Sequence, residues 1–163
     1  NYRLNEFSAA IALAQFEKVK KFLKLRRKMG VEIEKMVKNC SYLKSQKISN
    51  KAYSTYYTAA VKITNSKIKW QAFKKMFIKN GGKDGIYASA QLLQNEPIIK
   101  KKSIGKCFRS CKVNCVRNCT GTPNSKDLQK SLLLFTTNQN SETEIKKQAK
   151  ALKKTISYFN SLI

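Results

Sequence analysis

No histidine occurs anywhere in the sequence, and acidic residues are scarce, with 9 Asp and Glu against 34 Lys and Arg. Without histidine, the chain lacks the commonest general base and the usual partner of a serine or cysteine nucleophile. It also lacks the glycine-rich patterns G-x-x-x-x-G-K-[ST] and G-x-G-x-x-G, which bind nucleotide phosphates. These absences exclude a hydrolase with a histidine-dependent triad. They indicate a supporting domain whose own chemistry is incomplete.

Long hydrophobic runs are missing as well. The longest apolar run covers residues 9–14, far short of the roughly 20 residues that a membrane-spanning helix needs. The first residues also lack the charged start, apolar stretch and small-residue cleavage site of a secretory signal. We therefore expect a cytoplasmic protein with no membrane segment. At 163 residues, of which 42% are hydrophobic, the chain suffices for one domain with a core.

The formal net charge of +25 suggests nucleic acid as a partner. All but five of the 34 basic residues are lysines, however, and these are spread along the whole chain. Arginine is the residue suited to bidentate contacts with phosphate and guanine, whereas lysine also serves as an ordinary solvated surface residue. No RNA-binding or helix-turn-helix signature is present. We expect no specific nucleic-acid binding, and a standalone basic helical module that binds a polyanion is the alternative interpretation.

The first 39 residues are predicted to be largely helical. Residues 4–29 contain no glycine or proline and are rich in good helix formers, with Asn5 as the N-cap. Residues 9–14 are apolar on every side, which predicts a part of the helix that is packed all round. Gly30 interrupts the pattern, and residues 31–39 can resume the helix on the same or a bent axis. One long helix with an apolar start and a polar end is expected.

Strands and helices alternate in the remainder of the chain. Alternating apolar positions and turn residues predict strands at 53–63 and 132–136. Residues 85–90 are predicted to form a third short strand or an extended approach to the loop that follows. The helix signals are Asn65 or Ser66 as a cap with Gly81-Gly82 as the stop, Thr122 before Pro123, and a capping box that begins at Ser141. The predicted inner faces contain Trp70, Phe73 and Phe77 in the first helix, and Ile145, Ala149, Leu152, Ile156 and Phe159 in the last.

This order of elements predicts an α+β fold. A long N-terminal helix is followed by a small sheet of about three or four strands that helices cover. We expect two parts, a linking helix at 1–39 and a small α+β domain at 40–163.

Four of the five cysteines recur every four residues, at Cys107, Cys111, Cys115 and Cys119, and Cys40 lies apart. Structural zinc sites usually present two close pairs with C-x2-C or similar spacing, which this segment does not match. On a helix, residues four apart drift by about 40° per step, so the four thiols do not converge on one tetrahedral ion. We expect ordinary reduced thiols and no metal, with a zinc or iron-sulfur site as the alternative.

The N-terminal segment NYRLNEFSAAIALAQFEKVKKFLKLRR resembles a motif of the DegT/StrS-type sugar aminotransferases, which are pyridoxal-phosphate enzymes of fold type I. The segments YYTAAVKI, IKWQAFKKMFIKNGG and GIYASAQLLQNEP, and the C-terminal region from PNSKDLQ onward, are similar to the family more loosely. The resemblance covers nearly the whole chain and is specific only in the first 27 residues. It implies the helix that leaves the large cofactor domain and the small α+β domain that follows.

The resemblance also implies which residues approach the cofactor. Asn1 matches the family asparagine that reaches the cofactor phosphate of the neighbouring subunit in a homodimer, and Arg3 matches the motif arginine. Arg3 suits a phosphate or an acidic substrate group, or a structural ion pair, whereas Tyr2 is expected to pack. Two departures from the family pattern are the sequence FTTNQN before the last helix and the segment from Cys107 to Cys119.

In the family the Schiff-base lysine belongs to the large domain and precedes the N-Y-R segment, so the resemblance implies that this chain holds no catalytic residue. The complete enzyme would transfer an amino group, typically from glutamate, to a keto group on a nucleotide-linked sugar. Such a reaction serves polysaccharide or cell-surface sugar biosynthesis. We expect the chain to be the C-terminal part of such an enzyme and to be inactive alone.

Overall fold

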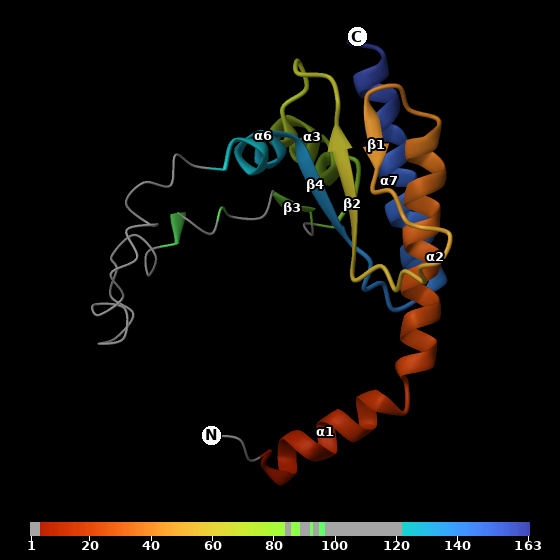
Figure 1. Ribbon diagram of the computed structural model, residues 1–163. Coiled ribbons are helices and arrows are strands. Elements are labelled where there is room, and N and C mark those ends of the chain that lie inside the picture. The colour runs from red at the N-terminus through yellow and green to blue at the C-terminus, as the bar shows by residue number, and fades with distance from the viewer. Residues whose placement is uncertain (1–3, 84–85, 89–91, 93–94, 97–121) are drawn as a thin grey trace, which may run out of the picture.

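A computed structural model describes residues 4–83, 86–88, 92, 95–96 and 122–163. Five helices and four strands lie in these ranges (Figure 1). In chain order they are α1 (Glu6–Phe16), α2 (Val19–Lys38), β1 (Leu43–Ser45), β2 (Thr58–Ile63), α3 (Trp70–Lys79), β3 (Ile86–Ala88), α6 (Pro123–Ser131), β4 (Leu132–Thr136) and α7 (Glu142–Asn160). The predicted α+β class is confirmed.

The four strands form one antiparallel sheet in the order β1-β2-β4-β3. Strand β4 lies near the centre, where Leu133 pairs with Val61 and Phe135 pairs with Ala59. All four of these side chains are buried, as the period of two residues in a half-buried strand requires. The outer strand β1 spans three residues, and the sequence analysis did not predict it.

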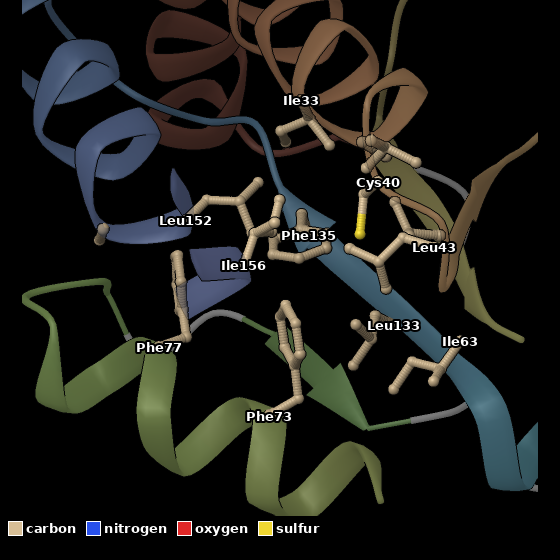
Figure 2. Close-up of a cluster of buried hydrophobic side chains, with 14 of the residues drawn as sticks. Ile33, Cys40, Leu43, Ile63, Phe73, Phe77, Leu133, Phe135, Leu152 and Ile156 are labelled. Atoms are coloured by element: carbon tan, nitrogen blue, oxygen red, sulfur yellow. The ribbon is translucent and has the colours of Figure 1, made fainter. Parts of the chain in front are cut away.

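The core lies between the sheet and the helices α2, α3 and α7 (Figures 1 and 2). Figure 2 shows Phe73 and Phe77 of α3 pointing toward Leu133 and Phe135 of β4. The rings of Phe77 and Phe135 meet edge to face with 5.8 Å between centroids, and Phe73 stacks on Phe159 of α7 at 5.5 Å. Aromatic pairs in these arrangements stabilise a core beyond the apolar area that they bury.

The predicted single N-terminal helix is wrong in one respect, because a turn at Glu17 and Lys18 divides it into α1 and α2. Asn5 is the N-cap of α1, as predicted, and its side chain accepts a hydrogen bond from the Ser8 amide at 2.8 Å. Gly30 does not interrupt the helix. It lies buried inside α2, which is continuous past it.

Two other predicted elements begin later than expected. The strand predicted from residue 53 begins at Thr58, because Tyr56 has a φ of 49°, which is incompatible with a strand. The helix predicted after Asn65 begins at Trp70. The Asn65 carboxamide instead accepts a hydrogen bond from the Lys67 amide at 2.9 Å and forms a local turn.

Most of the C-terminal predictions are confirmed, although the Thr122 side chain forms no capping hydrogen bond and Ala149 is only half-buried. Strand β4 has the predicted bounds, Pro123 is at the start of α6, and Ser141 caps α7 by accepting a hydrogen bond from the Glu144 amide at 3.2 Å. The inner face of α7 also contains Gln148 and Thr155, two buried polar residues that the apolar pattern did not reveal. Their side chains accept hydrogen bonds from the Lys83 amide and the Asn80 carboxamide, and so connect α7 to the C-terminal end of α3.

Candidate functional site

The residues expected to approach a cofactor, Asn1 and Arg3, lie outside the described residues, as does Tyr2. The described chain begins at Leu4, directly before the N-cap of α1. The N-terminus of a helix attracts anions, because its first amides have no partner within the helix and its dipole is positive at that end. The sequence therefore places Asn1 and Arg3 shortly before a helix end that favours a phosphate group.

Helix α1 has an exposed apolar surface and no buried residue. The expected all-round packing of residues 9–14 is not found within the described chain. Figure 1 shows α1 extending away from the sheet at an angle to α2. Its large apolar side chains are exposed by 86% at Phe7, 72% at Phe16, 65% at Ile11 and 61% at Leu13. Large exposed apolar patches mark sites of contact with another protein surface, and α1 is apolar and exposed around its circumference.

A second surface, between α2 and the loop before β2, combines two arginines with two tyrosines. We call Arg26, Arg27, Tyr53 and Tyr57 the arginine–tyrosine cluster. The guanidinium carbon of Arg27 lies 3.8 Å from the centroid of the Tyr53 ring, and that of Arg26 lies 5.6 Å from the Tyr57 centroid. These are cation–π distances, which hold each guanidinium over a ring.

Hydrogen bonds to the backbone fix the same guanidiniums. Arg26 donates from Nη1 to the Tyr57 carbonyl at 3.2 Å, and Arg27 donates from Nη1 to the Ser54 carbonyl. The helix therefore places both arginines against the loop that precedes β2, at a sequence separation of about 30 residues. This cluster was not predicted from the sequence. The signals present were the adjacent arginine pair and the density of tyrosine in YSTYY.

Tyr56 anchors this loop to the fold. Its side chain is buried, and the Thr137 hydroxyl donates a hydrogen bond to its carbonyl. Burial and a hydrogen bond with Glu34 raise the pKa of the Tyr56 phenol above its ordinary value. The phenol therefore stays neutral at physiological pH, and Tyr56 stabilises the fold. The side chains of Tyr53 and Tyr57, in contrast, are exposed.

An open surface groove of about 560 Å³ lies beside the C-terminal end of β2 and the start of α3. Lys62, Lys69, Trp70 and Lys130 are among its lining residues, and Lys62 lies 3.9 Å from Asp127. Its three lysines make this groove a second basic surface.

No metal centre is found among the residues that the structure describes. No group of three or more His, Cys, Asp or Glu side chains is arranged to hold a metal there. Cys40 is a buried free thiol, and the four closely spaced cysteines, Cys107 to Cys119, lie outside the described ranges. Within those ranges no helix is long and apolar enough to cross a membrane.

The described residues also do not fit pyridoxal phosphate by themselves. A Schiff-base lysine needs a site shielded from water, but the buried polar side chains of the described part are Thr137, Gln139, Gln148 and Thr155, with no lysine or carboxylate among them. No catalytic step can therefore be assigned to the described residues.

The chain is similar in fold to several solved structures. The chain has the fold of an aminotransferase TlmJ from Streptoalloteichus hindustanus, with a TM-score of 0.64 and 12% identity over 96% of this chain. It is also similar to 3-amino-5-hydroxybenzoic acid (AHBA) synthase, with a TM-score of 0.66 and 14% identity over 97% of this chain. A third similar structure is the sugar aminotransferase CalS13 from Micromonospora echinospora, with a TM-score of 0.61 and 16% identity over 94% of this chain. The match covers 38%, 40% and 37% of those chains respectively, so this chain spans about two fifths of their length.

A search of curated protein sequences finds no significant match. The sequence model of the DegT/DnrJ/EryC1/StrS aminotransferase family, in contrast, matches residues 1–113. That match covers more than half of the chain and includes α1, α2, the first three strands and α3. The chain belongs to the DegT/DnrJ/EryC1/StrS aminotransferase family.

Proposed function

We propose that the chain is the C-terminal part of an aminotransferase whose large domain precedes Asn1. The observation that carries this proposal is the exposed apolar surface of α1, in a chain that spans about two fifths of its structural relatives. If a large domain precedes this chain, its absence would leave the apolar surface of α1 exposed. Residues 1–39 then link the domains, and residues 40–163 form the small domain, to whose core α2 contributes Met29, Ile33 and Val37.

The activity that we assign to the whole enzyme is amino transfer from glutamate to a keto group on a nucleotide-linked sugar. Family membership and the similarity to CalS13, a sugar aminotransferase, support this assignment. It places the enzyme in polysaccharide or cell-surface sugar biosynthesis. Pyridoxal phosphate, bound to the whole enzyme, supplies the chemistry that carries the amino group.

The role that we assign to this chain's own residues is cofactor binding across a homodimer. The Asn1 carboxamide donates to the cofactor phosphate of the neighbouring subunit, and Arg3 adds a guanidinium for phosphate or for an acidic substrate group. The adjoining N-terminus of α1, which Asn5 caps, supports this role because it favours negative charge. We also place the enzyme in the cytoplasm, where a buried free thiol such as Cys40 stays reduced.

The test is an amino-transfer assay on the gene product extended upstream of Asn1. We expect 2-oxoglutarate to form from glutamate with a nucleotide-linked keto sugar as acceptor. We expect Asn1→Ala to weaken pyridoxal phosphate binding roughly tenfold, because a hydrogen bond to a charged group is lost. Asn50→Ala, which changes an exposed turn residue, is the matched control. An extended protein that binds no pyridoxal phosphate, or that consumes no glutamate with any keto sugar, would contradict the proposal.

The 163-residue chain alone gives a second readout. Mixed with pyridoxal phosphate and reduced with borohydride, it should show no adduct at one defined lysine. Only low labelling scattered over exposed lysines is expected, because the described part has no buried lysine. A stoichiometric adduct at a single lysine would show that the chain has a cofactor site of its own, and would overturn its assignment as an inactive part.

A further inference from the structure

Both arginines of the arginine–tyrosine cluster are held in place without a carboxylate partner. In the part of the chain that the structure describes, neither Arg26 nor Arg27 takes part in an ion pair. Each guanidinium makes one hydrogen bond to a backbone carbonyl. A guanidinium has five N–H donors, so most of the donors on each group remain available for a ligand.

The tyrosine rings are equally available. Tyr53 and Tyr57 are exposed by 74% and 80%. Each ring has a guanidinium over one face, so its opposite face can stack on a planar group. Exposed aromatic rings beside cationic side chains are the elements with which proteins hold a nucleic-acid base and its phosphates.

The cluster is also rigidly supported, which lowers the entropy cost of binding. Tyr56 lies between the two exposed tyrosines in the sequence. It has a left-handed backbone, and its ring packs against Gly30 of α2. The Thr137 hydroxyl, which donates to the Tyr56 carbonyl, ties the loop to the end of β4. Helix α2 and the sheet thus hold the loop from both sides.

Its place in the fold separates the cluster from the other basic surface. Figure 1 shows the loop before β2 beside α2. The groove that contains Lys62, Lys69 and Lys130 lies at the opposite end of β2. Of the two basic surfaces, only the cluster combines arginines with exposed aromatic rings.

We propose that the arginine–tyrosine cluster binds the nucleoside diphosphate of a sugar nucleotide. The guanidiniums of Arg26 and Arg27 donate to phosphate oxygens, a geometry for which arginine is better suited than lysine. The ring of Tyr53 or Tyr57 stacks on the base. This inference rests on the proposed function, because it assigns the part of the substrate that stays unchanged while the sugar receives its amino group.

The experiment measures binding of UDP to the 163-residue chain by calorimetry at low and at physiological salt. We expect saturable binding of one UDP, weakened roughly tenfold by Arg26→Gln or Arg27→Gln, because each change removes charged hydrogen bonds. Arg27→Lys should weaken binding as well, since lysine cannot make the bidentate contact. Tyr53→Leu and Tyr57→Leu should reduce the preference for UDP over inorganic pyrophosphate.

The matched control is Lys69→Gln combined with Lys130→Gln, which removes two positive charges from the groove. Circular dichroism of every variant checks that α2 and α7 remain folded. The proposal is overturned if UDP does not bind saturably, if the groove variant loses as much affinity as the arginine variants, or if pyrophosphate binds as tightly as UDP. The binding assay involves no amino transfer, so its failure is distinct from failure of the aminotransferase assay on the extended chain.

Discussion

The backbone of Gly30 lies directly against the ring of Tyr56. A Cβ at position 30 would stand 2.3 Å from Cγ of Tyr56 and 2.9 Å from its Cβ. Glycine inside a helix normally weakens that helix. Here it allows α2 to approach the loop before β2, and the approach brings Arg26 and Arg27 to the tyrosines on either side of Tyr56.

Gly30→Ala should therefore destabilise the protein, although alanine is the better helix former. Overpacking against the ring costs roughly 1–3 kcal/mol, of which the gain in helix propensity offsets about 1 kcal/mol. We expect a lower midpoint of urea unfolding. A Tyr56→Gly background, which removes the ring, should make the same substitution less costly in a double-mutant cycle. An alanine at position 30 that stabilises the protein would show that the two residues do not meet.

Asn5→Ala should weaken α1 without changing global stability. Loss of this N-cap costs about 1 kcal/mol of helix stability, but α1 has no buried residue to connect it to the core. We expect faster amide exchange from Ser8 to Phe16 and an unchanged urea midpoint. Ser141→Ala removes the equivalent cap from α7, which is packed in the core, and should lower that midpoint. Equal shifts in the two variants would refute the separation of α1 from the folded core.

Two carboxylates in the N-terminal turn of α7 should make the stability of the protein depend on pH in the acid range. A hydrogen bond and charge interaction with Lys28 lower the pKa of Glu142 below its usual 4.5. The Asn140 amide and then Lys83 lower the pKa of Glu144 in the same way. A carboxylate whose pKa is lower in the folded state stabilises that state above its unfolded pKa, and the contribution is lost as pH falls through the folded pKa.

The melting temperature should therefore stay level from neutral pH to about pH 5 and fall below it. With Glu142→Gln and Glu144→Gln together, the fall should be shallower, because neither group then titrates. Glu17→Gln, in the turn between α1 and α2, removes the same kind of charge as a control and should leave the curve unchanged. If the melting temperature of the double variant fell with pH as steeply as that of the parent, the loss of stability would come from other groups.

Phe7→Gln with Ile11→Gln tests whether α1 is a contact surface. Both side chains are exposed, so the free energy of unfolding should change by less than about 0.5 kcal/mol. Self-association and binding of an apolar dye should decrease, because exposed apolar area is removed. Phe73→Ala, at a fully buried phenylalanine, should instead cost about 3–5 kcal/mol. A large loss of stability in the α1 variant would mean that this helix packs within the chain.

The elements best predicted from sequence are those whose local signals agree with their packing. Strand β4 spans the residues predicted from its apolar run. Helix α7 begins directly after its predicted cap, Ser141. The start of β2 was predicted too early, because Tyr56 has a left-handed backbone that no local sequence pattern reveals. Its ring packs against Gly30, 26 positions earlier in the sequence. Strand β1 has only three residues, too few for an alternating pattern to reveal.

The site was less predictable for the same reason. The arginine–tyrosine cluster joins a helix to a loop about 30 residues away, and no local spacing encodes that contact. Asn1 and Arg3 were identified by resemblance to a family, and their roles stay predictions. Membership of that family is confirmed by the match over residues 1–113.

The most direct test of the C-terminal assignment is the mass of the native protein in its source cells, measured with an antibody against residues 142–160. Because the structural relatives have chains that this one covers by 37–40%, we predict a single band more than twice the 18.6 kDa of these 163 residues. Mass spectrometry of that band should find peptides that continue upstream of Asn1 and include the lysine that pyridoxal phosphate labels. A native band at 18.6 kDa, with no larger form, would contradict the assignment.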